Sequence, residues 1–117
     1  TPVNALKWSS QEDWESIGLA KPGTGDVVII PEGAWIMLDE DVTLKHIFID
    51  GVLEVEPEMD IRFEVEVMVV RLGKFIVGYE DAPYSKKFVL VLKVSPSICS
   101  FFFLFTEKAP FIQVKYF

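Results

Sequence analysis

Three short stretches of this 117-residue chain decide its fold, because each repeats the same pattern around one glycine. They are Ile29-Ile-Pro-Glu-Gly-Ala-Trp-Ile-Met37, Ile47-Phe-Ile-Asp-Gly-Val-Leu-Glu-Val55 and Val69-Val-Arg-Leu-Gly-Lys-Phe-Ile-Val77. Each stretch reads apolar, apolar, two variable positions, glycine, variable, apolar, variable, apolar. The central glycines, Gly33, Gly51 and Gly73, are 18 and then 22 residues apart. The pattern predicts a short strand, a tight glycine corner and a second short strand, three times over.

A repeat near 20 residues suits one coil of a parallel β-helix, in which each coil stacks on the previous one and extends a buried ladder. An antiparallel meander with glycine at its hairpin turns is the alternative. Parallel pairing between the strand of Ile47 and the strand of Val69 distinguishes the two. We expect an all-β fold, with three interior columns made by aligning the stretches on their glycines. The columns are Ile29, Ile47 and Val69; Trp35, Leu53 and Phe75; and Met37, Val55 and Val77.

One short helix is predicted before the repeats, over residues 8–18. Ser9 followed by Glu12 is the pattern of a capping box, and Gly18 is a plausible C-terminal stop. Such a helix is too short to be stable alone, so the face that carries Trp14 and Ile17 must dock on the rest of the chain. We expect the helix to cover the open N-terminal end of the stack.

The composition excludes several function classes. The net charge is −7, which is unfavourable for neutralising the phosphates of a nucleic acid. The single cysteine, Cys99, can form neither an internal disulfide nor a cysteine-based zinc site. The only histidine is His46, which we expect at the surface. No catalytic residues, cofactor or metal are therefore predicted.

The remaining candidates for ligand or ion binding are Trp8 and the acidic turn with Asp39 and Asp41. Further acidic candidates elsewhere in the chain are Asp50, Asp60 and the pair Glu80-Asp81. Calcium needs six to eight converging oxygens, whereas adjacent carboxylates on a turn are more often solvated. Trp8 and Trp35 have faces that suit a sugar ring, although core packing is the simpler interpretation for Trp35. Glutamates 54, 56, 58, 64 and 66 read as solvated strand faces, and their charge argues against direct capture of an anionic polysaccharide.

The ordered motifs resemble a known family. Trp8 and Trp14 precede Pro22-Gly-Thr-Gly-Asp26, and Val27-Val-Ile-Ile-Pro-Glu-Gly33, Ile49-Asp-Gly-Val-Leu-Glu-Val55 and Gly73-Lys-Phe-Ile-Val-Gly78 follow. This arrangement resembles the domain named for its eight glycines. That family occurs in fibrocystin and fibrocystin-like proteins, and in the cell-migration-inducing hyaluronan-binding protein and the related cell-surface hyaluronidase. The acidic strands and Ala82-Pro-Tyr84 are more similar to the fibrocystin branch.

The resemblance implies a right-handed parallel β-helix over residues 4–93, with structural corners at Gly33, Gly51, Gly73 and Gly78. It also implies an extracellular or cell-surface location within a larger membrane-associated protein. We expect a non-enzymatic interaction module of a fibrocystin-like receptor, whose ligand is an extracellular protein or a carbohydrate. The alternative is part of a hyaluronan-binding or hyaluronan-degrading protein.

Residues 94–117 differ from the rest of the chain. Residues 1–84 contain 6 basic and 17 acidic side chains, whereas residues 85–117 contain 5 and 1, together with most of the phenylalanines. Residues 88–94 are predicted to add one strand to the stack, and beyond Pro96 no pairing partner is predicted. The tail is typical of translated non-coding sequence, or alternatively of an anchor for a lipid or partner. Its charge-free stretch, residues 94–106, is too short to span a bilayer.

Overall fold

The computed structural model describes residues 2–78, 86–92, 101–105 and 112–115 of the chain. Within these residues it contains ten strands and one short helix, so the predicted all-β class is confirmed. The elements are β1 (Leu6–Lys7), α1 (Gln11–Ser16), β2 (Val27–Ile30), β3 (Trp35–Leu38), β4 (Val42–Ile49), β5 (Val52–Val55), β6 (Ile61–Val70), β7 (Lys74–Val77), β8 (Phe88–Leu92), β9 (Phe101–Phe105) and β10 (Ile112–Lys115).

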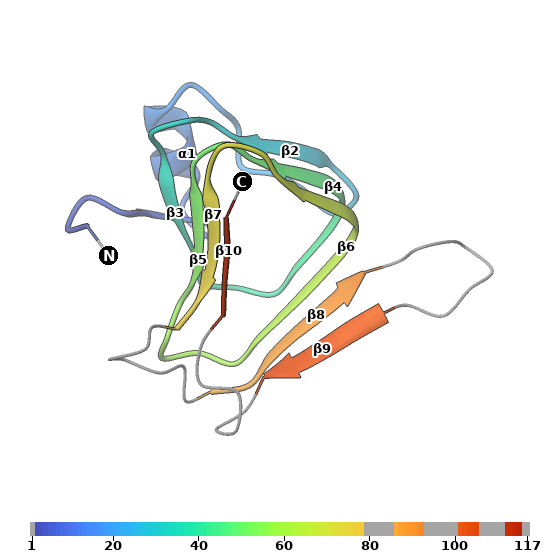
Figure 1. The fold of residues 1–117 in the computed structure, drawn as a ribbon. Helices are drawn as coiled ribbons and strands as arrows, with labels where there is room; N and C mark the ends of the chain where they lie inside the picture. Colours follow the sequence, from blue (N-terminus) through green and yellow to red (C-terminus); the bar gives the residue numbers. More distant parts are fainter. Residues whose placement is uncertain (1, 79–85, 93–100, 106–111, 116–117) are drawn as a thin grey trace.

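The strands form two five-stranded sheets, and the chain alternates between them from β1 to β8. The first sheet has the order β1-β3-β5-β7-β10 and the second has the order β2-β4-β6-β8-β9. Figure 1 shows the short strands β3, β5 and β7 superposed on one side, with the longer β4 and β6 on the other. All pairings from β1 to β8 are parallel, including the pairing of β4 with β6. The alternative fold, an antiparallel meander, is therefore wrong for these strands.

The N-terminal segment folds onto the core through two tryptophans. Ser10, not Ser9, caps α1, and its Oγ accepts a hydrogen bond from the backbone N–H of Asp13. Trp14 is buried, and its Nε1 donates to the carbonyl oxygen of Trp8 at 2.8 Å. The two indole rings meet edge to face with centroids 5.1 Å apart. Ile17 is partly buried and packs against the core, as predicted.

The observed columns differ from the predicted ones by one residue in several places. Ile36, not Trp35, pairs with Leu53, while the predicted pairing of Leu53 with Phe75 is confirmed. Leu38, not Met37, pairs with Val55. In the second sheet the buried Ile47 pairs with Val28 and Met68 instead of Ile29 and Val69.

The three corners have unequal lengths, which explains this shift. The last aligned residues of the second sheet are Ile30, Ile49 and Val70, and the first aligned residues of the first sheet are Trp35, Val52 and Lys74. The corners between them therefore contain Pro31-Glu-Gly-Ala34, Asp50-Gly51 and Arg71-Leu-Gly73. The position equivalent to Gly51 is therefore Ala34, whose carbonyl accepts from Val52 N, just as the carbonyl of Gly51 accepts from Lys74 N. Alignment on the glycines assumed corners of one length.

The C-terminal strands close both sheets. β8 pairs in parallel with β6, which confirms the strand predicted after Phe88. β9 then pairs antiparallel with β8, and β10 pairs antiparallel with β7. The prediction that nothing beyond Pro96 has a pairing partner is therefore wrong for these two strands. The domain boundary after residue 93 stays a prediction.

Helices play little part in the fold. In the described part of the chain, no helix has the length and apolar character needed to cross a bilayer.

Candidate functional site

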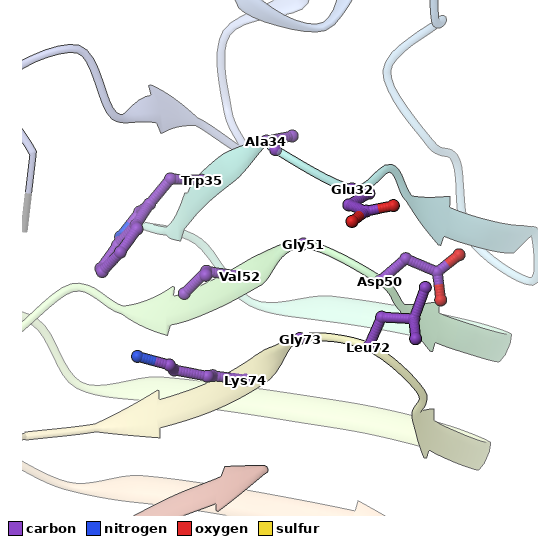
Figure 2. A pocket seen from close by; sticks show the side chains of 10 residues that line it. Glu32, Ala34, Trp35, Asp50, Gly51, Val52, Leu72, Gly73 and Lys74 are labelled. Atoms are coloured by element: carbon purple, nitrogen blue, oxygen red, sulfur yellow. The ribbon is translucent and has the colours of Figure 1, made fainter. Parts of the chain in front are cut away.

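A shallow groove of about 420 Å³ runs across the three corners, and we call it the glycine-corner groove. Figure 2 shows the three corners one above another, with bare backbone at Gly51 and Gly73. The lining residues are Glu32, Gly33, Ala34, Trp35, Asp50, Gly51, Val52, Leu72, Gly73 and Lys74. The groove thus combines an aromatic ring, apolar side chains and charges of both signs on an otherwise regular surface.

The predicted structural corners owe their glycines to two different causes. Gly33 has φ +88°, a conformation that L side chains rarely adopt, and its Cβ position is open. At Gly51 and Gly73 the backbone angle is not the constraint. A Cβ on Gly51 would overlap the carbonyl oxygens of Pro31 and Ala34, and one on Gly73 would overlap the carbonyl of Gly51. These two glycines are needed because successive corners touch.

One rim of the groove is the outward row Trp35, Val52 and Lys74, which the strand register places side by side (Figure 2). Trp35 is half-buried, and its Nε1 donates to Glu54 Oε1 at 3.0 Å. Glu54 itself is only 2% exposed, so the expectation that it lies on a solvated face is wrong. This hydrogen bond fixes the indole beside the groove.

The other rim carries an ion pair. Arg71 donates from Nε and Nη2 to the two carboxylate oxygens of Asp50, at 2.8 and 2.7 Å. These hydrogen bonds raise the pKa of Arg71 above its ordinary value. The guanidinium also lies 4.9 Å from the ring centroid of Phe48, and Leu72 beside it is 62% exposed. Sequence reasoning missed Arg71, Leu72 and Lys74; their place in the variable positions around a repeated glycine was the signal available.

The acidic candidates hold neighbouring segments together. Asp39 accepts hydrogen bonds from the backbone N–H and the Oγ of Ser9, at 2.9 and 2.7 Å. Asp41 accepts from Arg62 N at 2.8 Å, and Asp60 accepts from Lys87 N at 2.8 Å. Each of the last two carboxylates therefore joins one strand entrance to the entrance of the next strand in the same sheet. No group of three candidate metal ligands occurs among the residues that the structure describes.

The aromatic and histidine candidates are distributed as follows. Trp8 is 1% exposed and packs against Trp14 and Phe63, which leaves no ring face for a sugar. His46, expected at the surface, is half-buried with its ring edge to face with Phe48. Of the predicted ligand candidates that the structure describes, Trp35 and Asp50 line the groove.

Carboxylates accumulate at the C-terminal ends of β3 and β5, where Asp39 and Glu56 follow the strands. Partial burial raises the pKa of Glu56, and the nearby charges of Asp39, Glu54 and Glu58 raise it further, while Lys7 acts in the opposite direction. The Glu56 N–H donates to the carbonyl of Leu38 at 2.9 Å, which fixes the backbone there.

Three sets of residues named in the sequence analysis lie outside the described residues. They are the paired acids Glu80 and Asp81, the stretch Ala82-Pro-Tyr84, and Cys99.

Comparison with known proteins identifies the family. The sequence profile of the G8 domain matches residues 8–102. The chain therefore belongs to the G8 domain family, as its motifs indicated.

The similar curated proteins are fibrocystins. The chain is 32% identical to fibrocystin-L from Mus musculus over 100 residues, which cover 74% of this chain. It is 30% identical to fibrocystin-L from Homo sapiens over 106 residues, and 25% identical to fibrocystin from Mus musculus over 112 residues. The aligned parts amount to 2% of each fibrocystin-L and 3% of the fibrocystin. No solved structure matches the chain.

Proposed function

We propose that this chain is a non-enzymatic interaction module of a larger, fibrocystin-like protein exposed at the cell surface. The observation that carries the proposal is the use of its carboxylates: Asp39, Asp41 and Asp50 each accept structural hydrogen bonds. A hydrolase of glycosides needs a free pair of carboxyl groups facing one substrate. Similarity to a small part of the fibrocystins supports a module within a larger protein.

The scaffold of this module is a short right-handed parallel β-helix with α1 over its N-terminal end. The alternation of β1 to β8 between two parallel sheets supports this architecture, because each passage through both sheets adds one layer. Trp14, buried in the common core, supports the covering role of α1. A crystal structure would test the handedness, and left-handed connections between the sheets would contradict it.

The glycine-corner groove is the ligand-binding surface in this proposal. Its half-buried Trp35 offers an aromatic edge, and Leu72 offers exposed apolar area beside the charges of Glu32 and Lys74. Such mixed lining suits a protein loop or a neutral sugar better than an acidic polysaccharide, because the chain carries a net charge of −7.

Two measurements test the proposed function. An antibody against this chain should label unpermeabilised cells that express the parent protein; labelling only after permeabilisation would contradict the surface location. Purified chain should leave the length distribution of fluorescent hyaluronan unchanged and should not retain it on a biosensor. Cleavage, or saturable binding that Trp35→Ala abolishes, would favour the hyaluronan-related alternative.

A further inference from the structure

The outer edge of β2 lies apart from the glycine-corner groove, and the two share no lining residue. Within the described part of the chain, β2 is the terminal strand of its sheet and pairs with β4 alone. The carbonyl of Asp26 accepts from Lys45 N at 2.9 Å, and that of Ile30 accepts from Asp50 N at 2.9 Å. Because backbone groups alternate in direction along a strand, those of Val27 and Ile29 point away from β4. Among the described residues, these four N–H and C=O groups have no hydrogen-bond partner.

The side chains at this edge are apolar and exposed. Val27 and Ile29 are 54% and 50% exposed, whereas Val28 and Ile30 are buried. Natural edge strands are usually protected from pairing by lysine, proline or a bulge. β2 has two β-branched residues at the unprotected positions, so its edge is suited to accept another strand.

Space for such a strand exists beside β2. A hollow of about 280 Å³ lies between β2 and the segment 19–22, and its lining includes Trp14, Leu19 and Val28. The first sheet contains a strand at this end of the molecule, since β1 pairs with β3. The second sheet has no corresponding strand before β2 among the described residues. An extended segment would occupy that position and place alternate side chains in the hollow.

We propose that the free edge of β2 binds an extended segment of a partner protein in which apolar residues alternate with Lys or Arg. Backbone hydrogen bonds to Val27 and Ile29 fix the segment, and its apolar side chains enter the hollow. The basic residues of the partner follow from charge, because the chain carries a net charge of −7. Lys21 and Asp26 both line the hollow, and the charge of Lys21 is compensated by its ion pair with Glu40 at 2.9 Å. Two copies of the chain would repel each other, so self-pairing through β2 is disfavoured. The inference rests on the proposed role as an interaction module.

The test uses a capped octapeptide of alternating lysine and valine, with an alternating glutamate and valine peptide for comparison. Binding to the full chain is measured by biosensor, and the contact is located by amide shifts in NMR. We expect the basic peptide to bind and the acidic one to bind at least about tenfold more weakly. The largest amide shifts should be those of Val27 and Ile29.

Two variants separate backbone pairing from simple charge attraction. Ile29→Pro removes an N–H that points away from β4, so the parallel pairing with β4 is preserved, and binding should weaken about fivefold to tenfold. Ile29→Thr keeps the N–H and the branched shape and should bind nearly as wild type. Val27→Lys should weaken binding of the basic peptide through charge repulsion, without altering the backbone of β2. Circular dichroism and thermal melting check that each variant is folded.

Three results would overturn the proposal. Unchanged affinity in Ile29→Pro would show that the edge hydrogen bonds are not used. Amide shifts centred on Trp35 and Lys74 would place the peptide in the glycine-corner groove. Concentration-dependent dimers of the free chain that Ile29→Pro abolishes would identify a second copy as the occupant. None of these results bears on surface labelling or hyaluronan cleavage, so failure here is distinguishable from failure of the proposed function.

Discussion

The first corner and the two later corners look alike in sequence but differ in what their glycines do. Gly33 adopts a left-handed backbone angle and has open space around it, whereas Gly51 and Gly73 have ordinary angles and no space for a side chain. Gly33 is needed for its backbone angle, whereas Gly51 and Gly73 are needed because a side chain there would overlap the neighbouring layer. A shared motif therefore does not imply a shared physical cause.

The largest effect is expected at the third corner. In Gly73→Ala the new methyl group would overlap the carbonyl of Gly51, which also accepts the hydrogen bond from Lys74 N. Backbone must move on both layers, so we expect a loss of about 4 kcal/mol or more in the free energy of unfolding. Urea denaturation measures it. Leu72→Ala, at the exposed neighbouring position, is the matched control and should change stability by less than about 0.5 kcal/mol. Equal losses in both variants would refute the contact argument.

The second-largest loss of stability is expected for a side chain that points into the core from the first sheet, and it should exceed the loss for one that points outward. Phe75 is 2% exposed in the interior column, so Phe75→Ala should cost about 3–5 kcal/mol. Trp35 is half-buried on the outward row, so Trp35→Ala should cost less, about 1–2 kcal/mol, despite the larger ring. Thermal melts of both variants test the order. If Trp35→Ala proves the more damaging, the register that places Ile36 inside is wrong.

A smaller effect is expected at the first corner. Gly33→Ala places a Cβ in open space but at φ +88°, which should cost about 1–2 kcal/mol. Gly33→Asn should recover part of that loss, because asparagine tolerates this region better than alanine. Denaturant midpoints of the two variants provide the measurement. A loss as large as that of Gly73→Ala would mean that the first corner is also limited by contact.

The smallest expected effect is a pH dependence of stability at Glu56, which follows the C-terminal end of β5. The pKa of Glu56 is raised above its ordinary value of 4.5, so the folded state holds the proton more tightly than the unfolded state. Stability should therefore fall as pH rises from about 4.5 through the folded pKa, and Glu56→Gln should remove that part of the pH dependence. The variant should be slightly more stable than wild type at pH 7 and equal to it at pH 4. Melting curves across this range check the sign, and Glu66→Gln on an exposed strand position is the control.

Much of the fold could be predicted because the repeats carry strong local information. The parallel pairing of β4 with β6, and the pairing of Leu53 with Phe75, follow from the spacing of apolar residues alone. The exact register did not follow, because the number of residues in each corner depends on how layers meet. Ile29 illustrates the error: its apolar character predicted burial, and it is half exposed at a sheet edge.

The candidate site was less predictable for a related reason. Asp39 and Asp41 could be recognised as acids on a turn, but their backbone partners, Ser9 and Arg62, are 30 and 21 residues away in the sequence. Burial of Glu54 likewise depends on neighbours that the local alternation does not reveal. Local pattern identifies which residues are unusual, and the stacking of layers decides what each one does.

The contact between corners also has a direction along the chain. Gly51 is constrained by Pro31 and Ala34 before it, and Gly73 by Gly51 before it, while alanine is accepted at the equivalent position of the first corner. An architecture of this kind can lengthen by duplication only if every added corner brings its own small residue. The first corner is limited by the backbone angle of Gly33 and not by overlap with a neighbouring corner, so evolutionary change should accumulate there more readily than at Gly51 and Gly73.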